Sequence, residues 1–85
     1  MSMYKVVKTN NDKIVGEFTT LEEAVKCIAR LVKIEAYELY ETDEIDKYAV
    51  EDILFDNETF IRKTMGYSHP DIESEYKIEK FKKSC

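Results

Sequence analysis

Hydrophobic and polar residues alternate near both ends of the chain, which is the pattern of half-buried β-strands. Two N-terminal runs, Tyr4–Lys8 and Lys13–Phe18, are rich in β-branched and aromatic side chains. The Thr, Asn and Asp residues at 9–12 favour a turn, because such side chains bond their own backbone. The sequence therefore predicts a β-hairpin over residues 3–18. On its second strand the expected buried face consists of Ile14, Gly16 and Phe18.

The next segment carries a strong helical signal. Thr20 opens a capping box, in which its hydroxyl accepts from the Glu23 amide and the Glu23 carboxylate reaches back to the Thr20 amide. Apolar residues then recur with a period of about 3.6, which predicts an amphipathic helix over about 21–33. The apolar stripe is Leu21, Ala24, Val25, Ile28, Leu31 and Val32. Ile34 falls off this stripe, so we expect the helix to end near Lys33.

Residues 36–41 fit two structures. Tyr37 and Tyr40 favour a third strand, because aromatic residues are enriched in strands. The absence of Gly and Pro, together with the helical spacing of Ala36 and Leu39, favours a longer helix instead. Of the two, we favour the strand.

The remaining sequence indicates two helices and a final strand. Residues 44–55 place four side chains on one helical face, namely Ile45, Tyr48, Ala49 and Ile53. Asn57 is expected to cap a short helix carrying Phe60, Ile61, Thr64 and Met65. Gly66 is expected to end that helix in the left-handed conformation, and Pro70 follows. Glu75–Phe81 alternates as a strand does, so the order β-β-α-β-α-α-β predicts one α+β domain over residues 1–85.

Charge is distributed unevenly along the chain. Residues 35–58 contain ten acidic residues and one basic residue, a net charge of −9, whereas the whole chain carries −5. Tyrosines, which are favoured anchors at interfaces, lie within this acidic segment. One hypothesis is an acidic face that docks a basic surface of another protein, and the alternative is a solvated surface segment. The residues expected to bind the partner are Glu38, Tyr40, Glu41, Asp43, Glu44, Asp46 and Tyr48.

Composition indicates the cellular compartment in which such a protein works. No apolar run exceeds three residues, so neither a signal peptide nor a membrane partner is expected. Cys27 and Cys85 lack the spacing of a disulfide or zinc framework, which favours the reducing cytoplasm. We therefore predict a small cytoplasmic regulator or inhibitor, whose lysine-rich and glutamate-rich composition suits a phage. A homodimer would add stability to so short a chain.

No catalytic, cofactor or metal site is predicted. The acids at 43–46 lack the spacing and the glycine of a calcium loop. Asp52 falls within the apolar stripe of the predicted 44–55 helix, where a half-buried carboxylate could act as an acid or base. We favour a structural role for it, or a different helix register. Cys27 and His69 show none of the further groups that a catalytic pair needs.

A nucleic-acid-binding protein is the alternative function. Lysines near the C-terminus are mixed with Tyr76 and Phe81, and basic groups mixed with aromatic rings bind single strands. The lysines concerned are Lys77, Lys80, Lys82 and Lys83, with Lys5, Lys8 and Lys13 joining them across a sheet. The negative net charge and the scarcity of arginine argue against this function.

Overall fold

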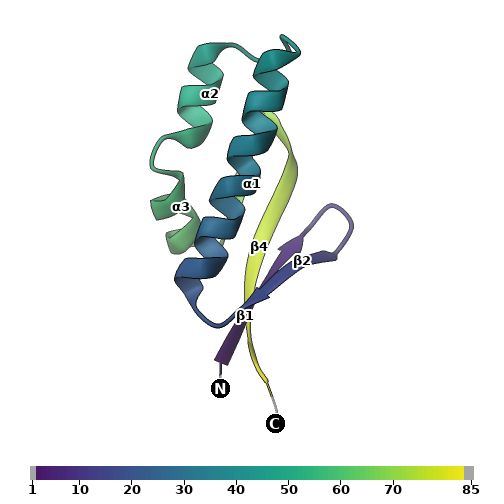
Figure 1. Ribbon diagram of the computed structural model, residues 1–85, viewed down its shortest axis with the longest axis vertical. Helices are drawn as coiled ribbons and strands as arrows, with labels where there is room; N and C mark the ends of the chain where they lie inside the picture. The colour runs from purple at the N-terminus through teal and green to yellow at the C-terminus, as the bar shows by residue number, and fades with distance from the viewer. Residues whose placement is uncertain (1, 84–85) are drawn as a thin grey trace.

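The first and last strands of the chain pair in the middle of a four-stranded antiparallel sheet. The computed structural model describes residues 2–83. Its strands are β1 (Ser2–Lys8), β2 (Lys13–Phe18), β3 (Gly66–His69) and β4 (Ile72–Lys82), in the spatial order β2-β1-β4-β3. Figure 1 shows β1 and β4 side by side, with the start of β1 and the end of β4 at the lower end of the molecule. Ser2 pairs with Lys82 there.

The predicted hairpin and C-terminal strand are confirmed, with two differences. β4 begins at Ile72 rather than at Glu75, and it pairs with β3, a four-residue strand too short to show a periodic pattern. In β2 the register shifts, so that Val6 lies opposite Gly16 but Val7 lies opposite Ile14. Because cross-strand partners share a face, this bulge turns Ile14 away from the face of Gly16. The prediction that Ile14 is buried was therefore wrong, and its side chain is 50% exposed.

Helix α1 (Leu21–Glu41) is continuous over 21 residues. The predicted end near Lys33 and the predicted strand at 36–41 were both wrong. Ala36 is fully buried and Leu39 is half-buried, so the apolar stripe continues past Ile34 for two more turns. With no Gly or Pro to interrupt the backbone, burial of this stripe favours helix over the strand preference of the two tyrosines.

The predicted capping box forms at the start of α1, in a modified geometry. The Glu23 amide donates to Thr20 Oγ1 at 3.2 Å, as expected. The Glu23 carboxylate accepts from the hydroxyls of Thr19 at 2.9 Å and Thr20 at 3.0 Å. These hydroxyl donors lower the pKa of Glu23.

Two short helices follow, α2 (Lys47–Leu54) and α3 (Asn57–Thr64). The helix predicted over 44–55 is confirmed in a shorter form, but its predicted face was wrong for Tyr48, which is 79% exposed. Val50 and Ile53 form its buried side.

The predicted ends of the second short helix were also wrong. The N-cap of α3 is Asp56, which is left-handed and makes no side-chain cap bond, so Asn57 is not the cap. Met65 ends α3 in the left-handed region with φ 58°, and Gly66 instead begins β3. A Cβ atom at Gly66 would lie 2.6 Å from the carbonyl oxygen of Tyr76, so close strand packing explains this glycine.

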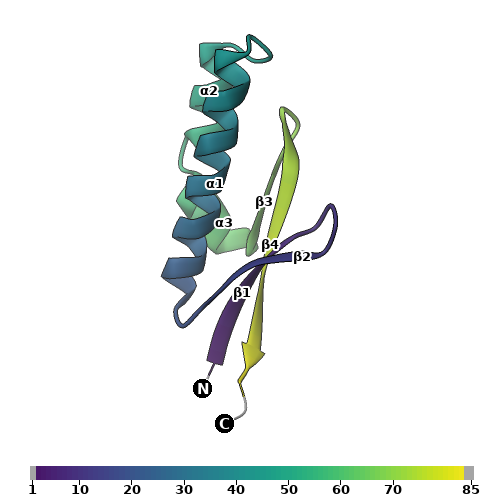
Figure 2. The same ribbon diagram turned by 45° about the vertical axis from the view of Figure 1, so that its right-hand side comes forward.

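The helices pack against one face of the sheet, which gives an α+β fold (Figure 2). The core between the layers includes Val6, Val25, Ile28, Val32, Ile53, Ile61 and Ile78. Asp46 caps α2, and the Tyr67 hydroxyl bonds its last turn. Within residues 2–83 there is no helix with the length and apolar character needed to cross a membrane.

Candidate functional site

The C-terminal end of α1 and the connection that follows it form an acidic end of the molecule. Glu38 and Glu41 lie in or next to the last turn of α1, and Asp43 and Glu44 follow in the connection. The last turn contains no basic residue, although the helix macrodipole favours cations there. In Figure 1 this end is the upper one, at the opposite pole of the 48 Å long axis from the paired ends of β1 and β4. Negative charge is therefore concentrated at one pole.

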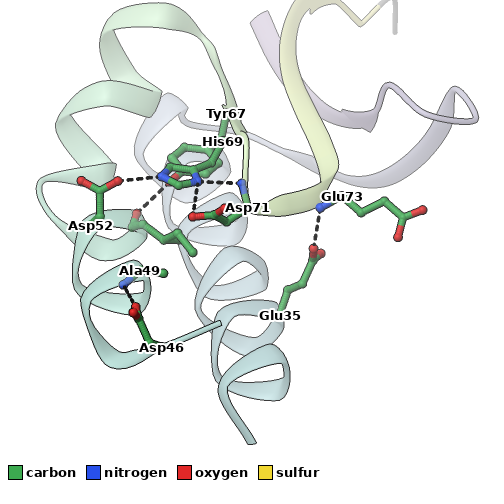
Figure 3. A network of polar contacts seen from close by, with 9 residues as sticks. Glu35, Asp46, Ala49, Asp52, Tyr67, His69, Asp71 and Glu73 are labelled. Atoms are coloured by element: carbon green, nitrogen blue, oxygen red, sulfur yellow. Dashed lines mark hydrogen bonds and ion pairs between the residues drawn. The ribbon is translucent and has the colours of Figure 1, made fainter. Parts of the chain in front are cut away.

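Local hydrogen bonds order the connection between α1 and α2. The Thr42 amide donates to the Glu38 carbonyl at 3.1 Å, and the Thr42 hydroxyl lies 2.7 Å from Glu44 Oε2. Asp43 adopts φ 60°, a left-handed conformation that Asp tolerates better than most residues. The Ala49 amide donates to Asp46 Oδ1 at 2.8 Å, which caps α2 (Figure 3). The acidic end thus has a defined backbone geometry.

A groove of about 630 Å³ lies beside this end, between α1, the β1–β2 turn and the β3–β4 turn. Acidic side chains from three parts of the chain line it: Glu35 and Glu38 of α1, Glu44, and Asp71 and Glu73 around the start of β4. Lys8 is the only basic residue among those described that line it. We call this surface the acidic groove.

Glu35 has a structural role within the acidic groove. Its Oε2 atom accepts from the Glu73 amide at 3.1 Å and lies 3.5 Å from the Ser74 amide. Figure 3 shows this side chain reaching from α1 to the first residues of β4. Glu35 therefore ties the β3–β4 hairpin to α1, and the other acidic residues of the groove are exposed.

The structure separates the seven residues predicted to bind a partner. Glu38 and Glu44 line the acidic groove, and Glu41 and Asp43 are exposed at the acidic end. Asp46 caps α2, so its carboxylate is already engaged. The two tyrosines lie elsewhere: Tyr40 borders a smaller groove between α1 and α2, and Tyr48 lies on the outer side of α2.

A polar network joins α2 to β3 and was not predicted (Figure 3). His69 Nε2 lies 2.8 Å from Asp52 Oδ2, and His69 Nδ1 accepts from the Asp71 amide at 3.1 Å. Because Nδ1 is an acceptor, the neutral ring carries its proton on Nε2 and donates it to Asp52. Both ring nitrogens are thus engaged, which leaves neither free to activate a nucleophile.

Tyr67 completes the contact between α2 and β3. Its buried hydroxyl donates to the Ile53 carbonyl at 2.8 Å. Burial, with a smaller contribution from the Asp52 charge, raises the pKa of Tyr67 from 10 to about 12.

Asp52 and Cys27 differ in burial and surroundings. The Asp52 side chain is 75% exposed, so its predicted place within the apolar stripe was wrong. Burial raises the pKa of the Cys27 thiol, the opposite of what a cysteine nucleophile needs. Cys85 lies outside the described residues. Within residues 2–83, no three His, Cys, Asp or Glu side chains are grouped closely enough to hold a metal ion.

Carboxylates are mixed with the lysines proposed for the nucleic-acid alternative. Lys77 Nζ lies 2.9 Å from Glu79 Oε2, and Lys5 Nζ lies 3.4 Å from Glu79 Oε1. Lys80 and Lys82 alternate with Lys77 along β4, so they project from the opposite face of the sheet. The sheet therefore offers no continuous basic face among these residues.

Comparisons with protein-family models, with curated proteins and with solved structures find no significant match to this chain. The function must therefore be argued from the site itself.

Proposed function

We propose that the protein is a non-catalytic binding module, a small regulator or inhibitor that docks a basic surface of another protein through its acidic end and acidic groove. The observation that carries this proposal is that Asp71 and Glu73 line the same groove as Glu38 and Glu44. These residues lie far apart in sequence, and one groove collects them with a single lysine among its described lining residues. The negative electrostatic potential of these carboxylates attracts and orients a basic partner.

The position of the acids supports a role in binding rather than in stability. Carboxylates in the last turn of a helix interact unfavourably with its macrodipole, and lysine or arginine would stabilise α1 there. Glu38 and Glu41 occupy these positions. A partner that supplies positive charge would relieve this repulsion on binding. The buried, free thiol of Cys27 suits action in the cytoplasm, which we also propose.

The test uses a polar arginine peptide, three copies of the heptad Ser-Ala-Ala-Arg-Arg-Ala-Ala, as a probe for a basic protein surface. The variant Glu38→Lys, Glu41→Lys, Glu44→Lys reverses the acidic end and leaves Asp43 in its left-handed conformation. We expect its affinity for the peptide to fall by about tenfold or more at low salt, because close charge pairs dominate such binding. Fluorescence anisotropy measures the change.

A matched control separates the acidic end from net charge. Glu17→Lys, Glu58→Lys, Glu75→Lys makes the same change in net charge at three carboxylates outside the acidic groove. This control should lose much less affinity than the acidic-end variant. Equal losses in the two variants would contradict the proposal, and so would tighter binding of single-stranded RNA or DNA than of the peptide. The predicted homodimer stays a prediction that light scattering can test.

A further inference from the structure

The two most exposed large apolar side chains among residues 2–83 lie at the two ends of α2, Tyr48 in its first turn and Phe55 at its C-cap. Tyr48 and Phe55 are each 79% exposed. Residues seven apart on a helix differ by only about 20° around its axis. Val50 and Ile53 occupy the opposite, buried side of α2. The two rings, which we call the aromatic stripe, therefore point directly away from the core.

Two carboxylates flank the aromatic stripe. Glu51 and Asp52 lie three and four residues after Tyr48, so they project on either side of the line between the rings. Within residues 2–83, Glu51 takes part in no ion pair, and Asp52 is paired only with His69. The outer side of α2 thus combines apolar area with two carboxylates, and Lys47 is the one basic residue of this helix, lining a neighbouring groove with Glu51.

A small cleft lies next to the stripe, with a volume of about 180 Å³. Phe55 and Phe60 border it together with Asp52, and Tyr67 and His69 also line it. Figure 3 shows the Asp52 carboxylate directed toward His69, with its second oxygen outside that contact. A carboxylate beside aromatic rings favours a cationic side chain, above all a guanidinium.

Three contacts hold this surface in place before any partner binds. Asp46 caps the start of α2, the Tyr67 hydroxyl bonds the Ile53 carbonyl, and His69 bonds Asp52. A rigid surface loses little entropy on binding, so exposed rings placed on it are effective anchors.

We propose that the aromatic stripe docks a basic amphipathic helix of a partner protein. That helix mirrors α2: it presents apolar residues seven positions apart against Tyr48 and Phe55, with arginines between them facing Glu51 and Asp52. One guanidinium enters the cleft beside Asp52. This inference rests on the proposed protein-binding function and names the class of partner, because the complement of an acid-flanked apolar stripe is a base-flanked one.

The test compares two synthetic peptides of equal charge. The first is three copies of the heptad Leu-Ala-Ala-Arg-Arg-Ala-Ala, and the second is the polar peptide with Ser in place of Leu. We expect the leucine peptide to bind about tenfold more tightly, and Tyr48→Ser with Phe55→Ser to abolish that difference. Asp52→Asn should weaken the leucine peptide further than it weakens the polar one. Circular dichroism verifies that each variant keeps the helical signal of the wild type.

A control pair tests whether apolar area in general is responsible. Ile14→Ser with Ile34→Ser removes two side chains that are about half exposed outside α2, and it should preserve the preference for leucine. Equal binding of both peptides, weakened only by reversal of Glu38, Glu41 and Glu44, would overturn this inference and leave the proposed function standing. Failure of both peptides to bind would overturn the proposed function as well. Loss of preference in the control pair would also overturn the inference.

Discussion

At the scale of single residues, the buried Tyr67 hydroxyl and the half-buried Glu35 carboxylate hold α2 and the β3–β4 hairpin in place. Tyr67 spans from β3 to the last turn of α2, and Glu35 spans from α1 to the start of β4. Each satisfies a backbone group that would otherwise lose its partner. The described part of the chain contains no buried side-chain nitrogen or oxygen without a partner.

Replacement of Tyr67 by Phe should destabilise the protein at pH 8, and this difference from the wild type should largely disappear at alkaline pH. Near pH 8 the variant loses the bond to Ile53, at a cost of about 1–2 kcal/mol. The folded pKa of Tyr67 is about 12 against an ordinary 10, so its stabilisation is complete below pH 10 and is lost as pH rises toward 12. By pH 11.5 this loss amounts to roughly 2 kcal/mol in the wild type, and it is absent from the variant. Urea unfolding at pH 8 and pH 11.5 measures both effects.

The exposed Tyr48 supplies the control. Tyr48→Phe removes a hydroxyl from a side chain that is 79% exposed, so it should follow the wild-type stability at both pH values. A Tyr67→Phe curve that stays parallel to the wild type from pH 8 to pH 11.5 would contradict the assignment.

At the scale of elements, α1 spans the sheet, and α2 is a short helix whose stability depends on its N-cap. α1 is long enough to cross the sheet and reach the acidic end, because Ala36 and Leu39 continue its apolar stripe. α2 has only eight residues, too few for an isolated helix to be stable. Its stability therefore comes from Val50 and Ile53 in the core and from the Asp46 cap.

Asp46→Ala should destabilise α2 selectively. Loss of the bond to the Ala49 amide costs about 1 kcal/mol, as for other N-caps. Amide hydrogen exchange should accelerate across Lys47–Leu54 more than in β1 or β4. Asp46→Asn keeps an oxygen acceptor and should retain most of the protection. If Asn proved as damaging as Ala, the negative charge rather than the cap would be responsible.

At the scale of the whole molecule, surface ion pairs join elements far apart in sequence. Arg62 of α3 donates to both carboxylate oxygens of Glu22 at the start of α1, at 2.7 and 2.8 Å. The Arg62 guanidinium lowers the pKa of Glu22, and the Lys77 ammonium lowers that of Glu79. Groups with lowered carboxyl pKa values contribute stability above their unfolded value of 4.5, and this contribution disappears as pH falls through the folded values.

Thermal melting should therefore show a decline in stability as pH falls below 4.5. Arg62→Gln should reduce the steepness of that decline, because the pKa of Glu22 returns toward its unfolded value. Lys63→Gln, which removes a neighbouring positive charge of α3, is the matched control and should keep the wild-type slope. Identical slopes in all three proteins would show that the Glu22–Arg62 pair does not contribute.

The candidate site was only partly predictable. The acidic segment and its tyrosines were visible in the sequence, and Glu38 and Glu44 do lie together. The sequence offered no signal that Asp71 and Glu73 join them, nor that His69 bonds Asp52. Those contacts link residues 17 or more positions apart, and a one-dimensional pattern does not report which distant residues meet.

The sequence alone determined the features that arise within a few residues. The hairpin, the Thr20 capping box and the apolar stripe of α1 follow from interactions with periods of two or 3.6, which adjacent residues specify directly. Tertiary structure decided the rest. It kept residues 36–41 helical by burying Ala36, rotated α2 so that Tyr48 faces outward, and moved Ile14 to the other face through a bulge. Residues 36–41 suited a strand and a helix almost equally, so burial of apolar area decided between them. The outward face of Tyr48 and the bulge beside Ile14 depend on packing and pairing with residues distant in sequence, which local patterns do not report.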